Sequence, residues 1–496
     1  MKVKETELKV RVKTINREQT VLRSVDVEEL IPSDHPARAI WEITGKLDLR
    51  GFYRKIESVE GEAGRAAIDP RLLISIWIYA YSEGEGSARE VSRQCEKDAA
   101  YQWLTGMEGI NHHTLSDFRV THQAELDKLF VDVLGVLSGE GLIEMKRVMQ
   151  DGTKIKANAG SASFRREERI REFLRLAREQ VKAMGDPAQE GRGKTEASRK
   201  RASEEREKRL ERALSELANI REAKKVSEAK EARASTTDPD ARIMKHGDGG
   251  YAPSYNVQIT TDSKEGIIVG VGVSQSASDQ EELTKAVERA EENLGKKPDQ
   301  VVADGGFTSA KNVVMMKAKG IDFIGSPQDH RGSMEGQMRK RGVDPGFYPN
   351  AFQYNAGCNG FICPAGKILR YEGSEKEEGY TRHIYRAAAY DCMNCPFKSK
   401  CCPHNAAKGR SLRRREDDPE VVAFKKRMQT DEAKAIYKQR GRYAEFSNLW
   451  IKAKNGLRQF HVRGKVKVEM EAMWACLACN IQQWIRLCWK PALGTT

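Results

Sequence analysis

The sequence predicts an α/β core that follows a helical N-terminal region and is interrupted by two insertions. Between residues 141 and 330, apolar strand-like segments alternate with helical patterns: YNVQITTD, GIIVGVGVS and QVVADGG. The stretch from Ser163 to about Arg233 is densely charged and has leucines at helical spacing. Six of the ten cysteines crowd between Cys358 and Cys402. We therefore expect a mixed fold with one long helical insertion and one cysteine-rich insertion.

The charge of the chain favours a polyanionic partner. Lys and Arg number 85 against 72 Asp and Glu, which gives a formal net charge of +13. Nucleic acid is the commonest partner for such an excess. The longest apolar stretch, around Leu72 to Ala80, is about half of what a bilayer requires. We therefore expect a cytoplasmic protein with no membrane partner.

The N-terminal region, residues 1–140, is expected to be a helical DNA-binding domain. Ser87 and Thr114 are predicted N-caps of two successive helices. Arg119 and His122 lie near the start of the second helix and are candidate DNA contacts in a helix-turn-helix arrangement. An ordinary helical bundle explains the same pattern equally well.

The α/β core is expected to comprise residues 141–330 and 425–490. Residues 263–266 are predicted to form a hairpin turn, and residues 279–294 a helix. The first insertion, residues 161–235, is predicted to be a pair of long helices broken near Gly185-Asp186-Pro187. The second, residues 350–415, contains the cysteine cluster.

Two acidic residues each follow an apolar strand and precede glycine: Asp151 and Asp304. At one edge of a sheet such acids can converge on a common point. Metal-assisted phosphoryl transfer requires this arrangement, since two Mg²⁺ ions about 4 Å apart activate the attacking oxygen and stabilise the leaving one. An Asp before Gly is also a common turn residue, so neither motif decides the matter alone.

Glu445 is the candidate third carboxylate. It lies on a predicted helix, with Arg442 three residues before it, Asn448 three after and Lys452 seven after. These spacings place the four side chains on one helical face. Such a glutamate can bind metal while its neighbours bind phosphate. A solvated surface helix with ion pairs is the alternative.

Several motifs resemble those of bacterial insertion-sequence transposases of the Asp-Asp-Glu type. The resemblance covers most of the chain and is greatest to the eleven-eighty-two group, near the broader IS-four-like class. The motifs that carry it are IDPRLLISIWIYAY, GSARE, HHTLSDFR, DGTKIKAN, STTDPDARIM, YNVQITTD, VVADGGFTS and GLRQFHVRG.

This resemblance implies a ribonuclease-H-like catalytic core with Asp151, Asp304 and Glu445 as its acids. It implies two divalent ions, Mg²⁺ or Mn²⁺, and cleavage of double-stranded DNA at the terminal inverted repeats. The freed 3′-hydroxyl would then join target DNA, in a homodimeric synaptic complex in the bacterial nucleoid. Arg463, in the motif GLRQFHVRG, is a further expected DNA contact.

The sequence departs from this family at one position. Related IS-four-like enzymes have a Tyr and an Arg upstream of the Glu at set spacing, followed by a Lys. Lys452 fits, but Gly441 occupies the expected arginine position, with Arg440 and Arg442 on either side. Which arginine contacts phosphate is therefore left open.

Four cysteines are candidate ligands of a structural Zn²⁺: Cys363, Cys392, Cys395 and Cys401. Cys358, Cys402 and His404 are spare candidates, and plain reduced cysteines are the alternative.

Two other functions remain open at this point. A nuclease of the same fold would only hydrolyse DNA, and an inactive, domesticated protein would only bind it. The three acids are all present, which argues against the inactive alternative.

Overall fold

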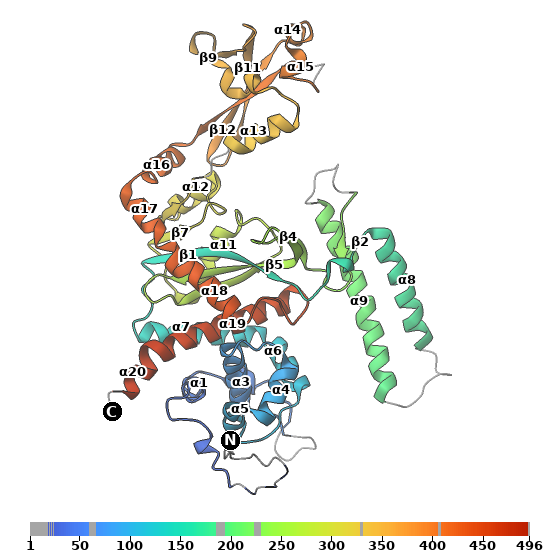
Figure 1. Ribbon diagram of the computed structural model, residues 1–496, viewed down its shortest axis with the longest axis vertical. Coiled ribbons are helices and arrows are strands. Elements are labelled where there is room, and N and C mark those ends of the chain that lie inside the picture. The colour runs from blue at the N-terminus through green and yellow to red at the C-terminus, as the bar shows by residue number, and fades with distance from the viewer. Residues whose placement is uncertain are drawn as a thin grey trace, which may run out of the picture.

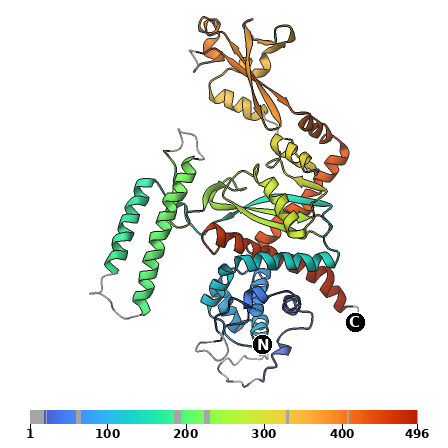
Figure 2. The same ribbon diagram turned by 180° about the vertical axis from the view of Figure 1, so that it is seen from behind.

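The computed structural model describes residues 24–58, 66–184, 194–222, 230–327, 331–404 and 408–494, with residues 18, 20 and 22. In Figures 1 and 2, a central sheet lies above the N-terminal helices and below a β-rich unit that contains the cysteines. A pair of long helices stands beside the sheet. The mixed α/β class agrees with the sequence prediction.

The N-terminal region is helical throughout its described residues. Its elements are η1 (Glu28–Leu30), α1 (Pro36–Gly45), α2 (Arg50–Tyr53), α3 (Pro70–Ser82), α4 (Ala88–Lys97), α5 (Ala99–Thr105), α6 (His112–Thr121) and α7 (Gln123–Gly139). Ser87 caps α4 as predicted, because its side chain accepts a hydrogen bond from the Glu90 amide. The predicted cap at Thr114 is wrong: Asn111 caps α6, and Thr114 lies inside the helix.

Six strands form the central sheet. They are β1 (Arg147–Lys156), β4 (Arg242–Lys245), β5 (Tyr251–Asp262), β6 (Ile268–Ser274), β7 (Gln300–Ala303) and β8 (Asp322–Gly325). Their order is β4-β5-β1-β7-β8, and β6 also pairs with β5. β5 pairs antiparallel with both β1 and β6, whereas β1, β7 and β8 are parallel. The predicted hairpin at residues 263–266 is therefore confirmed. Helices α11 (Glu282–Leu294) and α12 (Ala310–Ala318) connect the strands.

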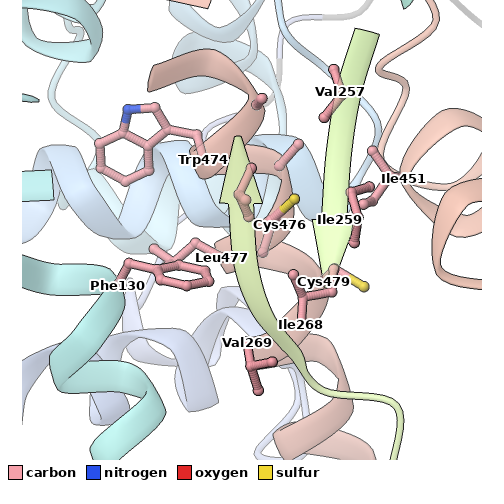
Figure 3. Packing of buried hydrophobic residues seen from close by; sticks show 14 of the residues in the cluster. Phe130, Val257, Ile259, Ile268, Val269, Ile451, Trp474, Cys476, Leu477 and Cys479 are labelled. Carbon is pink, nitrogen blue, oxygen red and sulfur yellow. The ribbon is translucent and has the colours of Figure 1, made fainter. Parts of the chain in front are cut away.

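One helix joins the sheet to the N-terminal region. Helix α19 (Lys465–Trp484) contacts β6 on one side and α3 and α7 on the other. Figure 3 shows its Leu477 beside Phe130 of α7, and its Cys479 beside Ile268 of β6. This burial explains the C-terminal cysteines as core residues, and it raises the pKa of Cys479 to about 12.

The first insertion is a helical hairpin with a small core of its own. It comprises η2 (Ser161–Ser163), β2 (Phe164–Arg165), α8 (Glu167–Met184), α9 (Lys194–Glu222) and β3 (Ala234–Ser235). Ile170 and Leu174 of α8 pack against Leu210 and Leu217 of α9. The predicted break at Gly185-Asp186-Pro187 lies outside the described residues.

The second insertion is a five-stranded antiparallel sheet in the order β13-β12-β11-β10-β9. Its elements are α13 (Arg331–Lys340), η4 (Pro345–Phe347), η5 (Pro349–Ala351), β9 (Gln353–Asn355), η6 (Ala356–Cys358), β10 (Gly360–Ile362), β11 (Ile368–Glu377), β12 (Tyr380–Ala387), α14 (Ala389–Met393), α15 (Lys398–Cys401) and β13 (Ser411–Asp417).

The chain returns from this unit to the central sheet through a series of helices. These are α16 (Pro419–Arg427), α17 (Asp431–Lys438), the π-helix η7 (Gly441–Glu445) and α18 (Phe446–Ala453). After α19 come a second π-helix, η8 (Ile485–Trp489), and α20 (Lys490–Leu493). Across the described part of the chain, every helix is too short or too polar to span a bilayer.

Candidate active site

Asp151 and Asp304 lie side by side at the end of a parallel strand pair. The last paired residues of β1 and β7 are Gln150 and Ala303, and each acid comes directly after one of them. The prediction that the first strand ends at Asp151 is wrong, because β1 continues to Lys156. Only β7 ends here, so Asp151 borders an edge that β7 no longer covers.

The surroundings of Asp151 disfavour its charge. Burial raises the pKa of Asp151 to about 6, and the nearby Asp304 adds to the increase. Arg440 opposes the shift, as do hydrogen bonds from the Gly152 amide and from Asn448. A carboxylate in such a position gains from a cation beside it.

Glu445 reaches Asp151 through Arg440. The Arg440 guanidinium donates to Glu445 Oε1 at 2.8 Å and to Asp151 Oδ2 at 3.3 Å. The Glu445 side chain is 59% exposed, whereas that of Asp151 is 13% exposed. The arginine therefore links a buried acid of the sheet to an exposed acid at the end of η7.

The π-helix explains the unusual arginine spacing. A π-helical turn contains one residue more than an α-helical turn, with hydrogen bonds from i to i+5. Over Gly441–Glu445 this extra residue brings Arg440, five positions before Glu445, onto the same side as that acid. Arg442 instead is exposed, with its guanidinium 5.5 Å from the Tyr443 ring centroid. The predicted DNA contact at Arg442 stays a prediction outside this cluster.

Two other residues of the predicted helical face do reach the acids. Asn448 Nδ2 donates to Asp151 Oδ2 at 2.9 Å. Lys452 lies near Asp151: burial lowers the pKa of Lys452, Asp151 opposes that shift, and Lys154 adds to it. The helical period that grouped Asn448 and Lys452 with Glu445 thus brings both to the sheet edge.

A fourth acid, Asp279, lies in this region and was missed by the sequence interpretation. It is in the connection between β6 and α11, and its Oδ1 accepts hydrogen bonds of 2.7 Å from Asn256 and Gln258. The strand pairing indicates why Asp279 lies near Asp151. β6 runs parallel to β1 with β5 between them, so a residue after β6 reaches the same sheet edge as Asp151.

Of the N-terminal candidates, Arg119 is buried and His122 is half-buried. Arg119 is 3% exposed, donates to Tyr81 Oη at 3.1 Å and lies 3.7 Å from Glu471. His122 packs between Phe52 and Phe118, with ring centroids 5.5 Å and 5.0 Å away. Both side chains make these packing contacts, and a contact of either one with DNA stays a prediction.

Arg463 is exposed on the loop before α19. Its Nε donates to the carbonyl oxygen of Asn158 at 3.1 Å. It lies outside the acidic cluster and stays a predicted DNA contact.

The four predicted zinc ligands line one small cavity of about 30 Å³ in the β-rich unit. Backbone amides point at two of the sulfurs: Lys367 N is 3.3 Å from Cys363 Sγ, and Arg410 N is 3.3 Å from Cys392 Sγ. Cys402 also lines the cavity, whereas Cys358 and His404 do not. Burial raises the pKa of Cys401 to about 12, and its neighbouring thiols add to the shift.

Two segments of the chain match known protein families. Residues 25–121 match a family described as Transposase domain (DUF772), and residues 362–485 match one described as Transposase DDE domain. Both families are transposase domains. The two matches support a DNA transposase, although together they span less than half of the chain. Glu445 lies inside the second segment, whereas Asp151 and Asp304 lie outside both.

A solved structure of a piggyBac transposase synaptic complex with hairpin DNA is also similar, at a TM-score of 0.32 and 8% identity. That alignment covers 91% of this chain and 73% of the other. No curated protein matches this chain.

Proposed function

We propose that this chain is a DNA transposase that cleaves the ends of its element and transfers the 3′-hydroxyl to target DNA. One observation carries the proposal: Asp151 and Asp304 lie together at the end of the β1–β7 pair, and Arg440 connects Glu445 to Asp151. Neighbouring carboxylates can hold the divalent ions that metal-dependent phosphoryl transfer uses. The family resemblance adds a third acid on a late helix.

The strand order supports a ribonuclease-H-like core for this enzyme. Three antiparallel strands, β6, β5 and β1, are followed in the sheet by the parallel strands β7 and β8. The resemblance described above assigns the first acid to the first strand, the second to the fourth core strand and the third to a late helix. Asp151 lies on β1, and Asp304 follows β7, which is the fourth strand of this sheet once the short edge strand β4 is set aside. Glu445 lies on a late helix.

The acids suit Mg²⁺ or Mn²⁺ by their chemistry. Both ions prefer carboxylate oxygens and retain waters, so a few acids suffice. Among the described residues, no three acidic, histidine or cysteine side chains stand close enough to bind one ion as they are. The Arg440 guanidinium lies between Asp151 and Glu445, where it supplies positive charge. When bound, divalent ions would neutralise charge on the attacking and leaving oxygens.

Arg440 has two roles in this proposal. In the arrangement described above it holds Glu445 against Asp151. With divalent ions on the acids, the Arg440 guanidinium would be free to bind a DNA phosphate, for which its planar fork of donors is suited. Lys452 and Asn448, which lie near Asp151, would hold the same strand in place.

Basic residues extend from the acids along the sheet. Lys154 and Lys156 continue β1 beyond Asp151. Burial lowers the pKa of His246, and the charges of these two lysines and of Lys452 lower it further. None of the ion pairs within the described residues includes Lys156 or Lys452. Lysine ammonium groups beside a phosphoryl-transfer site suit a DNA backbone, so we assign double-stranded DNA as the partner. Joining two element ends would require a homodimer on DNA.

The DNA that flanks this chain's own reading frame supplies the test substrate. Incubating it with the protein, Mg²⁺ and a plasmid target should give cleaved ends and joined products. D304N, which removes one metal-binding charge with little change in shape, should give neither while still binding DNA. Cleavage without joined products would identify a nuclease that only hydrolyses, and binding without cleavage by the unsubstituted chain would identify an inactive DNA-binding protein.

A structural Zn²⁺ in the cysteine cavity is a second part of the proposal. Cys363, Cys392, Cys395 and Cys401 supply four sulfurs, and two of these already accept backbone hydrogen bonds. Such N–H donors stabilise thiolates, the form in which cysteine binds zinc. The ion would hold the small β-rich unit together, because its apolar core contains few residues.

A further inference from the structure

Asp279 lies closer to the two strand-end acids than its place in the sequence suggests. A Cβ atom added to Gly306 would lie 2.9 Å from Asp304 Oδ1 and 3.5 Å from Asp279 Oδ2. One methyl group would therefore touch both carboxylates. The carboxylates of Asp304 and Asp279 therefore border the same small space beside Gly306.

The glycine after Asp151 faces Asp279 as well. A Cβ atom on Gly152 would lie 2.5 Å from Asp279 Oδ1, a distance that carbon and oxygen do not tolerate. Gly152 is in the middle of β1, where glycine has no turn to make and costs conformational entropy. The residue at position 152 must be small because the Asp279 carboxylate occupies the space that a side chain would need. Gly152 therefore leaves room for Asp279, and Gly306, two residues after Asp304, lies within contact distance of the same acid.

The two oxygens of Asp279 have different surroundings. Oδ1 accepts hydrogen bonds from Asn256 and Gln258, which fix the orientation of the carboxylate. Oδ2 accepts no hydrogen bond from the described residues, and Lys154 Nζ is 4.0 Å away. The fixed carboxylate therefore presents one oxygen towards the Asp304 side.

A second polar group at this position is incompletely satisfied. Asn256 is fully buried, and its amide donates to Asp279, yet its Oδ1 has no hydrogen-bond partner among the described residues. A buried acceptor without a partner is costly unless a ligand or water completes it. Waters retained by a bound Mg²⁺ are donors of the required kind.

We propose that Asp279 is a further carboxylate ligand of the divalent-metal site, sharing an ion with Asp304, and that Asn256 accepts a hydrogen bond from a water of that ion. This inference rests on the proposed metal-dependent function and adds a residue to its site. Asp279 follows β6 and Asp304 follows β7, so the site would include residues after both of these strands in addition to Asp151 on β1.

A purely structural role for Asp279 predicts different behaviour. In that case its only task is to accept hydrogen bonds from Asn256 and Gln258, and an uncharged acceptor would serve. D279N retains an oxygen for both donors and removes the charge that a metal requires. E281Q removes a charge from the exposed acid two residues later and is the matched control.

The decisive measurement is Mn²⁺ binding to the full chain, by calorimetry and by electron paramagnetic resonance, with and without DNA. D279N should weaken binding by at least about tenfold, as loss of a metal contact does. D304N should weaken it as well, whereas E281Q should match the unsubstituted chain. The thermal shift that Mn²⁺ produces should shrink in D279N, and the melting temperature without metal reports folding separately.

The outcomes separate this inference from the proposed function. If D304N weakens Mn²⁺ binding and D279N does not, Asp279 is structural and the inference fails while the function stands. If the unsubstituted chain binds no Mn²⁺ with or without DNA, the proposed function fails first. If D279N does not fold, D279E decides: restored folding with restored Mn²⁺ binding supports the inference, and restored folding alone overturns it.

Discussion

Arg440 donates a hydrogen bond to Glu445, which lies five residues later. The two residues are joined by a π-helical turn, which contains about one residue more than an α-helical turn. The same guanidinium donates to Asp151 on β1. The π-turn is therefore what brings a cation to the acids of the sheet. π-turns are rare and frequently occur at functional sites.

The first prediction distinguishes the two arginines beside Gly441. R440Q should lower the single-turnover rate of DNA cleavage by about 10²–10³, the usual effect of removing a charged donor from a transition state. R442Q should change the rate by less than about fivefold, because an exposed side chain of this kind contributes little. Equal losses in both variants would contradict the assignment of Arg440.

The second prediction concerns pH and stability. The pKa of Asp151 is raised in the folded state to about 6, so the native protein binds more protons than the unfolded chain between about pH 4 and 6. Ionised Asp151 therefore lowers stability above pH 6, and the penalty disappears as the pH falls through that window. In EDTA, D151N should melt at a higher temperature than the unsubstituted chain at pH 8.

The control for that experiment is a second pH. Near pH 4, Asp151 is already protonated in the folded protein, so the difference in melting temperature should vanish. A difference that persists unchanged from pH 8 to pH 4 would show that packing, and not charge, is responsible.

The third prediction follows from the interior position of Arg119. R119A leaves Glu471, which is fully buried, without its cation, and should cost about 3–5 kcal/mol of unfolding free energy. Urea denaturation measures this loss. R93A, in the exposed part of α4, should cost less than about 1 kcal/mol. Reduced DNA affinity in R119A with unchanged stability would contradict the structural role.

The fourth prediction concerns zinc. Metal analysis of the purified chain should find about one Zn²⁺, the number expected for a four-cysteine structural site. C392S should abolish it, whereas C358S should retain it, because Cys358 is exposed and lies outside the cavity. Less than one zinc per chain, or equal loss in both variants, would reject the site.

Local patterns in the sequence predicted much of the fold. Apolar strand patterns predicted β5 and β6, and Ser87 predicted the start of α4, because these signals act over a few residues. The helical period also grouped Asn448 and Lys452 with Glu445. A period of 3.6 residues is a property of the backbone and needs no tertiary contact.

Long-range packing decided the rest. Whether Asp151 lies beside Asp304 depends on the register of β1 against β7. That register is set by the packing of side chains more than a hundred residues apart in the sequence. Arginine is usually a surface residue. Arg119 is nevertheless buried, because α19 covers it and supplies Glu471 as its ionic partner. The sequence by itself determined which acids and cations are present and which helix carries Glu445. Only the tertiary structure decided that a π-turn selects Arg440 and that Asp279 joins the acids, because both depend on surfaces that meet after the strands have paired.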